Sequence, residues 1–391
     1  MSATEANRPR RRGPRRQELP GFASDRVDKI RRAGNVWKLS GGEIRLPDVF
    51  GFCQGVKRAL TMLEQAVAAH RGHGGRMLLL GQIIHNPWVN AYFESRGVRI
   101  LTAEQIRQPE RHIEAADCAV IPAFGVPVPI ERRLHAIGCR IVDTSCGDVR
   151  RLWSWAGREA DGGFGVLIFG RAAHDETVVT KSRLADRGGR YVVVGNLDQS
   201  RRFCDLVTGR AEGASFAEQF GPDATNAADL TPFDRLAQVS QTTMLYEETL
   251  AVRQLLTEAY TERFGPDELG RRLAFQPTVC RATQARQGAA VALCRQGCDV
   301  VLVVGGFGSS NTRHLYELAR GYARAWFIED DEAIRSSREI ATFDPAEDRH
   351  FVAADWLPDR RPVRVGVLAG ASSPEIVVGR VVEKLARFLE Q

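Results

Sequence analysis

Gly51-Phe52-Cys53-Gln54-Gly55-Val56 is the stretch that decides how this chain folds. It places a cysteine in a glycine-flanked turn directly before residues 56–70, where the following apolar residues recur at helical spacing: Val56, Leu60, Leu63 and Val67. The spacing predicts that Cys53 lies at the N-terminus of an amphipathic helix. There the free backbone amides and the positive end of the helix dipole stabilise a thiolate, which is the form of cysteine that ligates metals.

Two further cysteines have the same surroundings. Cys146 follows a short apolar strand at 140–142 and precedes a helical pattern, and Cys280 also precedes a helical pattern. Three thiolates from separate units can hold three irons of a [4Fe-4S] cluster and leave the fourth iron open, because such clusters are normally held by four cysteines. The sequence therefore predicts a cluster bound by Cys53, Cys146 and Cys280. The alternative is that all three are ordinary buried cysteines.

The remaining cysteines lack this context, and we expect them to be core or surface thiols: Cys118, Cys139, Cys204, Cys294 and Cys298.

The rest of the chain also shows a pattern that repeats three times. About 25 residues beyond each helix-starting cysteine, an apolar strand ends in glycine and gives way to a polar loop and a helix. We interpret this pattern as three copies of one α/β unit, each with a cysteine and two polar loops at strand ends.

The repeats divide the chain into four parts. Residues 1–43 are expected to be a basic, disordered N-terminal extension, followed by α/β domains at 44–145, 146–278 and 279–391. The second domain contains an insertion-like stretch at 209–236 that is rich in Gly, Ala, Asp and Pro, and we expect a surface loop with a short helix there. Plastid-type targeting, or docking of an acidic partner, is the alternative role of the extension.

Composition limits the partners and the compartment. The formal net charge of +6 comes mostly from arginines near the N-terminus, so the folded part is close to neutral and its charge does not argue for nucleic-acid binding. No apolar run reaches membrane length, and no hydrophobic segment follows the basic N-terminus as a secretory signal would require. Eight cysteines in 391 residues fit metal binding or free thiols better than a disulfide framework. We therefore expect a cytoplasmic protein without membrane or nucleic-acid partners.

Polar side chains gather where the expected strands end or helices begin, and there side chains and free amides together bind phosphate oxygens. The set suits a diphosphate, and it consists of His85, His174, Thr283, Ser309, Asn311 and Ser372. Glu176 is the best candidate proton donor, and Thr242 and Thr243 could orient it through hydrogen bonds. Taken singly, each Ser or Thr could instead be a helix cap, and Glu176 could complement a helix dipole.

These motifs resemble those of a known family. The chain is similar to the LytB/IspH family of 4-hydroxy-3-methylbut-2-enyl diphosphate reductases, in its longer branch from chloroplasts and cyanobacteria. The likeness covers roughly residues 45–388, in the family's order. The matching pieces are Gly51-Phe52-Cys53, Ile83-Ile84-His85-Asn86-Pro87, Pro122-Ala123-Phe124-Gly125, Ala173-His174, Glu176-Thr177, Gln241-Thr242-Thr243-Met244-Leu245, Ala282-Thr283-Gln284, Arg286-Gln287, Ser309-Ser310-Asn311-Thr312 and Gly370-Ala371-Ser372.

The resemblance implies three pseudo-threefold-related α/β domains around a central [4Fe-4S] cluster with one open iron, held by Cys53, Cys146 and Cys280. It implies that Glu176 relays protons with Thr242 beside it. The diphosphate would be held by His85, His174, Thr283, Ser309, Ser310, Asn311 and Ser372. The implied reaction is the reductive dehydroxylation of 4-hydroxy-3-methylbut-2-enyl diphosphate to isopentenyl and dimethylallyl diphosphate in the methylerythritol phosphate pathway, with a ferredoxin- or flavodoxin-like electron donor.

Four residues that flank the expected cluster ligands depart from the family pattern: Gln54, Gly147, Asp148 and Arg281. They leave open the alternative that the chain is a paralogue that acts on a different allylic or phosphorylated substrate. A non-redox [4Fe-4S] hydro-lyase and a non-enzymatic iron–sulfur sensor are further alternatives. A structural zinc protein would use the three cysteines together with His174.

Overall fold

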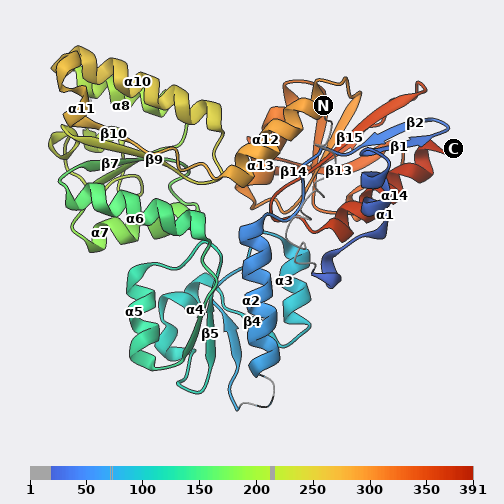
Figure 1. Cartoon of the computed structure of the whole chain (residues 1–391), viewed down its shortest axis with the longest axis horizontal. Coiled ribbons are helices and arrows are strands. Elements are labelled where there is room, and N and C mark those ends of the chain that lie inside the picture. Colours follow the sequence, from blue (N-terminus) through green and yellow to red (C-terminus); the bar gives the residue numbers. More distant parts are fainter. Residues whose placement is uncertain (1–18, 71, 73, 212–215, 391) are drawn as a thin grey trace, which may run out of the picture.

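The computed structural model describes residues 19–70, 72, 74–211 and 216–390. Its chain forms three α/β lobes that meet at the centre of the molecule, each built on its own sheet (Figure 1). The α/β class and the three-domain arrangement predicted from the repeats are confirmed. Among the described helices, none is long and apolar enough to cross a membrane.

The first lobe contains a parallel sheet with strand order β4-β3-β5-β6. Its strands are β3 (Met77–Leu79), β4 (Val98–Ile100), β5 (Cys118–Ile121) and β6 (Arg140–Asp143). Its helices are α2 (Gln54–His70), α3 (Pro87–Glu94), α4 (Ala103–Arg107) and α5 (Val128–Ile137). The apolar positions that predicted α2 are all buried, together with Ala59 and Ala66. The helical spacing in the sequence therefore marks the face that packs on the sheet.

The second lobe repeats this order with the sheet β8-β7-β9-β10, again parallel. Its strands are β7 (Gly165–Phe169), β8 (Tyr191–Val194), β9 (Leu236–Ser240) and β10 (Leu273–Phe275). Its helices are α6 (Gly147–Asp161), α7 (Asp175–Asp186), α8 (Leu197–Thr208), α9 (Phe216–Gln219), α10 (Tyr246–Phe264) and α11 (Leu269–Arg272). The stretch 209–236 holds a short helix as expected, but it is more than a surface loop, because Phe216, Phe220 and Phe233 are buried in the core.

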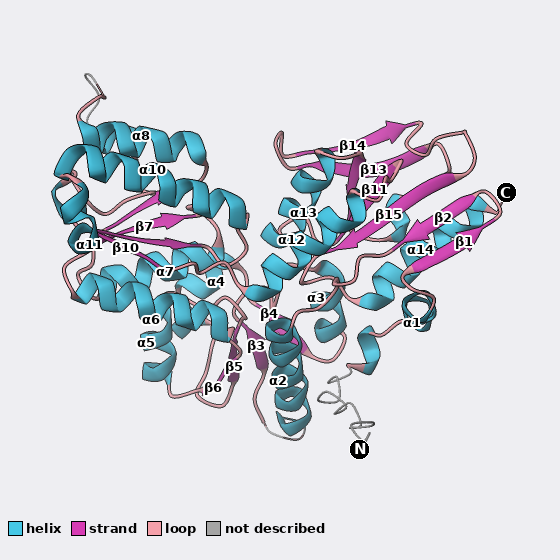
Figure 2. Cartoon of the chain, turned by 45° about the horizontal axis from the view of Figure 1, so that its top comes forward, coloured by secondary structure: helices cyan, strands magenta, loops and turns pink. Residues whose placement is uncertain are grey.

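The third lobe has the sheet β12-β11-β15-β2, which β1 extends at its edge as an antiparallel strand. Its strands are β1 (Val36–Leu39), β2 (Gly42–Arg45), β11 (Val300–Val304), β12 (Arg324–Ile328) and β15 (Val363–Ala369), with the separate hairpin β13 (Glu339–Asp344) and β14 (Arg349–Ala354). Its helices are α1 (Asp25–Arg32), α12 (Arg281–Cys294), α13 (Ser310–Arg320) and α14 (Glu375–Leu389). In Figure 2 the strands of this lobe lie at the right of the view and those of the second lobe at the left.

The prediction that residues 1–43 form a disordered appendage is wrong for the part that the structure describes. Val27 and Ile30 of α1 are buried in the core of the third lobe, and β2 pairs with β15. Gly42 has a φ of +156° and lies so close to β15 that a Cβ atom there would come within 2.1 Å of the Val363 carbonyl oxygen. Residues 36–45 therefore belong to the third domain. The arginine-rich residues 1–18 lie outside the described residues.

The lobes are linked through the cysteines. Strand β6 of the first sheet leads through Cys146 to α6 of the second lobe, and β10 of the second sheet leads through Cys280 to α12 of the third. Strand β2, which belongs to the third sheet, leads through Cys53 to α2 of the first lobe. Each cysteine thus lies where the chain leaves a strand of one sheet for a helix of the next lobe, which brings all three towards the centre.

Candidate active site

A cavity of about 630 Å³ lies where the three lobes meet. All twelve residues that the sequence singled out line it: Cys53, His85, Cys146, His174, Glu176, Thr242, Cys280, Thr283, Ser309, Ser310, Asn311 and Ser372. They come from all three lobes. The fold therefore gathers in one place side chains that are scattered over more than 300 residues of sequence.

The three cysteines lie at helix N-termini, as predicted. Cys146 and Cys280 are the N-cap residues of α6 and α12, and Cys53 directly precedes α2. Backbone amides point at two of the sulfurs, because Val56 N donates to Cys53 Sγ at 3.4 Å and Thr283 N donates to Cys280 Sγ at 3.3 Å. The thiol of Cys280 in turn donates to Thr283 Oγ1 at 3.2 Å.

Gly55 leaves room where two cysteines approach each other. A Cβ atom on this residue would lie 2.7 Å from Cys146 Sγ and 3.7 Å from Cys53 Sγ, so any larger side chain would fill the space beside the sulfurs. A group held by these thiols would need that space. A single zinc ion would need its ligands within about 2.0–2.3 Å of one point. Among the described side chains, no group of three or more His, Cys, Asp or Glu has that arrangement.

Burial decides the charge of the free thiols. It raises the pKa of Cys146, and it raises the pKa of Cys280 to about 11, although hydrogen bonds from backbone amides act in the opposite direction. The backbone amides at the helix N-termini favour the thiolate, as expected, but burial outweighs them for these two residues. Cys146 and Cys280 are therefore poor candidates for free reactive thiols, and soft sulfur ligands at helix N-termini fit a thiolate-bound metal cluster better.

Glu176 is the acid of the cavity. It lies in the first turn of α7 and is only 4% exposed. Its carboxyl group accepts hydrogen bonds from Thr242 N at 2.6 Å and from Thr242 Oγ1 at 2.7 Å. Burial raises the pKa of Glu176 to about 7, and the two Thr242 hydrogen bonds limit the rise. The side chain therefore carries a proton for a large fraction of the time near neutral pH, and Thr242 fixes its orientation.

Two histidines form an adjacent wall. The His85 ring stacks on Phe124 with centroids 4.7 Å apart, and its Nε2 lies 2.8 Å from a carboxylate oxygen of Asp175. His174 is the N-cap of α7 and accepts a hydrogen bond from Glu176 N on Nδ1 at 3.2 Å. Burial and the nearby His85 lower the pKa of His174 to about 3, so its ring is neutral and Nε2 carries the hydrogen. Asp175 was missed by the sequence analysis although it lies between two predicted residues.

The N-terminus of α13 supplies the opposite wall. Ser309 is its N-cap residue and accepts a hydrogen bond from Ser372 Oγ at 3.1 Å. The side-chain oxygen of Asn311 accepts from Ala371 N at 2.8 Å, whereas its amide nitrogen is buried without a hydrogen-bond partner. Buried donors are normally paired, so this amide group is a place where a ligand oxygen would bind. The helix N-terminus favours an anionic ligand at the same place.

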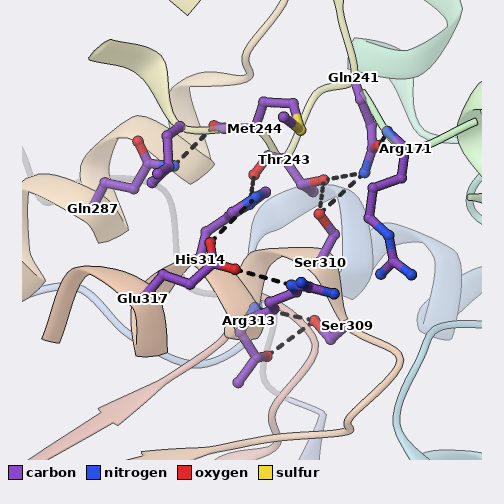
Figure 3. A network of polar contacts seen from close by, with 12 residues as sticks. Arg171, Gln241, Thr243, Met244, Gln287, Ser309, Ser310, Arg313, His314 and Glu317 are labelled. Atoms are coloured by element: carbon purple, nitrogen blue, oxygen red, sulfur yellow. Dashed lines mark hydrogen bonds and ion pairs between the residues drawn. The ribbon is translucent and has the colours of Figure 1, made fainter. Parts of the chain in front are cut away.

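A polar network behind this wall joins the second and third lobes (Figure 3). Gln241 Nε2 donates to Thr243 Oγ1 at 2.8 Å and to Ser310 Oγ at 3.1 Å, and Thr243 Oγ1 donates to Ser310 Oγ at 2.9 Å. His314 Nδ1 lies 2.7 Å from the carbonyl oxygen of Thr243. Sequence analysis assigned no role to Gln241 or His314. One signal was present, because His314 follows Ser310 by one helical turn and so shares its face of α13.

The departures from the family pattern lie at the rim of the cavity. Gln54, Gly147 and Arg281 are exposed, and Asp148 forms an ion pair with Arg151. Gln54, Asp148 and Arg281 also line the cavity, so three of the four departures face the site. Glu176 and Asn311 themselves are buried, at 4% and 3% exposure.

Comparisons with known proteins agree with this geometry. The family model described as "LytB protein" matches residues 44–386. The chain is 32% identical to a protein of Thermosynechococcus vestitus over 374 residues (94% of this chain and 90% of that protein), and 34% identical to one of Gloeobacter violaceus over 372 residues (93% and 87%). Both relatives are named 4-hydroxy-3-methylbut-2-enyl diphosphate reductase.

Two solved structures share the fold. One is a structure of (E)-4-hydroxy-3-methyl-but-2-enyl diphosphate reductase, with a TM-score of 0.53, 23% identity and coverage of 88% of this chain and 99% of that one. The other is the E-1-hydroxy-2-methyl-but-2-enyl-4-diphosphate reductase from Plasmodium falciparum, with a TM-score of 0.62, 18% identity and coverage of 87% and 86%. With the family model matching nearly the whole described chain, this protein belongs to the LytB protein family.

Proposed function

We propose that this protein reductively dehydroxylates 4-hydroxy-3-methylbut-2-enyl diphosphate to isopentenyl and dimethylallyl diphosphate, the last step of the methylerythritol phosphate pathway. The observation that carries the proposal is one cavity that combines three helix-starting cysteines, a buried carboxylic acid and an unpaired amide donor at a helix N-terminus. Relatives that are 32–34% identical over nearly the whole chain bear the name of this reductase. The reaction consumes two electrons and two protons and releases water.

Membership of the family implies an iron–sulfur cofactor. We propose that it is a [4Fe-4S] cluster held by Cys53, Cys146 and Cys280, with one iron that has no protein ligand. When bound, such a cluster supplies electrons and a Lewis-acidic iron. Gly55 keeps the space beside two of the sulfurs open. A ferredoxin- or flavodoxin-like protein is the proposed electron donor, and the cytoplasm is the proposed compartment.

The diphosphate would bind between the histidine wall and the N-terminus of α13. The buried Asn311 amide nitrogen supplies a donor that has no other partner, and His174 supplies the N–H of a neutral ring. Hydroxyl groups complete this set of donors, from Thr283, Ser309, Ser310 and Ser372. Charge-assisted hydrogen bonds to phosphate oxygens are stronger than neutral ones, so even a few of them orient the ligand.

Glu176 would deliver a proton to the departing hydroxyl group. Its proton is available near neutral pH, and its position is fixed by two hydrogen bonds from Thr242. Protonation lets the oxygen leave as water instead of hydroxide, which lowers the barrier to breaking the carbon–oxygen bond. The buried site also keeps bulk water away from this carboxylic acid.

The proposal is tested by an anaerobic assay of the cluster-loaded protein with the allylic diphosphate and a strong one-electron reductant. We expect both isomeric diphosphates as products, with two electrons consumed per turnover. Turnover without consumption of the reductant would indicate a hydro-lyase instead. A fully loaded protein that leaves this diphosphate unchanged would indicate a paralogue with another substrate, or a sensor.

A further inference from the structure

Arg286 carries a buried positive charge beside the cysteines. It lies on α12, lines the cavity and is only 5% exposed. Its guanidinium group donates to the carbonyl oxygen of Gly51 twice, from Nε at 3.1 Å and from Nη2 at 2.5 Å, and from Nη1 to the carbonyl oxygen of Ala282 at 2.9 Å. All three contacts are with uncharged acceptors.

Such a charge needs a counter-charge. Burying an unpaired ion costs several kcal/mol, and arginine does not escape the cost by losing its proton. Among the described residues, no carboxylate forms an ion pair with Arg286, whereas other arginines form ion pairs with carboxylates elsewhere. Burial lowers the pKa of Arg286, and the groups whose negative charge would oppose this effect are the thiolate forms of Cys53 and Cys280. The compensation therefore has to come from the thiolate end of the cavity.

Arg286 also connects two of the three cysteine loops. It is six residues beyond Cys280 on the same helix, and its two bonds to Gly51 reach the loop that ends in Cys53. Gly51 has a φ of +70°, a conformation that glycine adopts without strain and that presents its carbonyl group to Arg286. One side chain thus links the third lobe to the first at the site of the cysteines.

We propose that Arg286 is a positioning residue that holds the Cys53 loop against α12 and supplies the fixed positive charge that stabilises the reduced, more negative form of the bound cluster. This inference rests on the proposed [4Fe-4S] cofactor. Three thiolates make the bound group anionic, and each added electron makes it more so. A positive charge fixed in a poorly polarisable interior lowers the free energy of the reduced form, and cluster potentials respond to such charges.

The test compares Arg286→Gln, Arg286→Lys and the wild type by EPR-monitored redox titration, after iron and sulfide have been quantified. Arg295→Gln is the matched control, because Arg295 is an exposed arginine that caps the other end of α12. We expect Arg286→Gln to make the cluster harder to reduce by at least tenfold in the reduction equilibrium, about 59 mV for one electron. Arg286→Lys should stay closer to the wild-type potential, and Arg295→Gln should equal it.

An unchanged potential in a fully loaded Arg286→Gln protein would overturn the proposal. If Arg286→Gln binds no iron, the Arg286→Lys variant tests whether the positive charge is what the site needs. Its retained charge should allow loading, and loss of iron there as well would show that the hydrogen-bond geometry matters and the charge does not. A wild-type protein that binds no cluster would instead contradict the proposed cofactor, so the two failures are distinguishable.

Discussion

Glu176 shows how a single residue is adapted to its environment. Burial favours its neutral form, and Thr242 holds both carboxyl oxygens from a neighbouring strand end. The pKa of His174 shifts in the opposite direction for the same reason, because burial disfavours the charged form of a base as it does that of an acid. His174 is therefore a neutral donor near neutral pH and Glu176 is protonated for a large fraction of the time, which suits a site that receives an anionic ligand.

The substitution Glu176→Gln keeps the shape of the side chain and removes the acidic proton. We expect turnover to fall by about 10²–10⁴-fold, the range for loss of a general acid, with nearly unchanged substrate binding. Steady-state and single-turnover kinetics of the loaded protein measure the effect. Equal iron content in both proteins is the control, and wild-type turnover in the variant would show that the proton comes from elsewhere.

The pKa of about 7 for Glu176 predicts a pH dependence. The proposed mechanism needs the protonated acid, so turnover should fall as the pH rises through about 7, and this decrease should be missing from the residual activity of Glu176→Gln. The folded-state pKa is raised above the ordinary value of 4.5, so this group favours the folded state fully below about pH 4.5. That contribution to the free energy of unfolding is lost as the pH rises towards 7. Rate profiles and denaturant titrations measure both effects.

Asn311→Ala should weaken binding of the diphosphate. Each charge-assisted hydrogen bond contributes about 1.5–3 kcal/mol, and the buried amide nitrogen has no other partner to compensate. Calorimetric titration with the substrate measures the loss, and the thermal midpoint of the ligand-free protein shows whether the fold is intact. If the folded variant binds the diphosphate with wild-type affinity, then Asn311 serves only to hold the backbone at Ala371.

At the scale of elements, residues at the N-termini of helices form much of the candidate site. The local spacing of apolar residues predicted α2, α6 and α12, and the cysteines that precede them reach the cavity as expected. Residues whose role depends on distant partners could not be predicted in this way. Gln241 meets Ser310 across 69 residues, Asp175 meets His85 across 90, and Arg286 meets Gly51 across 235. Only the fold brings these pairs together.

Helix α12 offers a matched pair of cysteines. Cys280 begins the helix at the cavity, and Cys294 is its last residue, buried in the core. We expect Cys280→Ser to lose the cluster or most of its iron after anaerobic reconstitution, and Cys294→Ser to keep wild-type iron content. Full iron content in Cys280→Ser would remove that residue from the ligand set.

At the scale of the whole molecule, the three lobes close into a ring. Each sheet ends in a strand that leads to the next lobe, and the N-terminal strand β2 completes the third sheet. The sequence predicted the three units but not this closure. Strand β2 is short, and its partner β15 follows about 320 residues later, so no local pattern reveals the pairing.

Ile44 tests the structural role of this N-terminal strand. It is fully buried between β15 and the core of the third lobe. We expect Ile44→Ala to lower the free energy of unfolding by about 2–5 kcal/mol, the cost of a core cavity. Lys38→Ala on the neighbouring strand β1 should have little effect, because Lys38 is exposed. Denaturant titration measures both variants. If Ile44→Ala were as stable as the wild type, the N-terminal strand would not be part of the third lobe's core.

The pairing of β2 with β15 sets the order of events during biosynthesis. Strand β2 is synthesised about 320 residues before β15. The first two sheets use strands that are complete well before then, so they can form during translation. The third sheet must wait until β15 has been synthesised. Because this lobe supplies Cys280 and α13 to the cavity, the proposed cofactor can be assembled only after β15 has been made, and a chain that stops before β15 has no complete cavity.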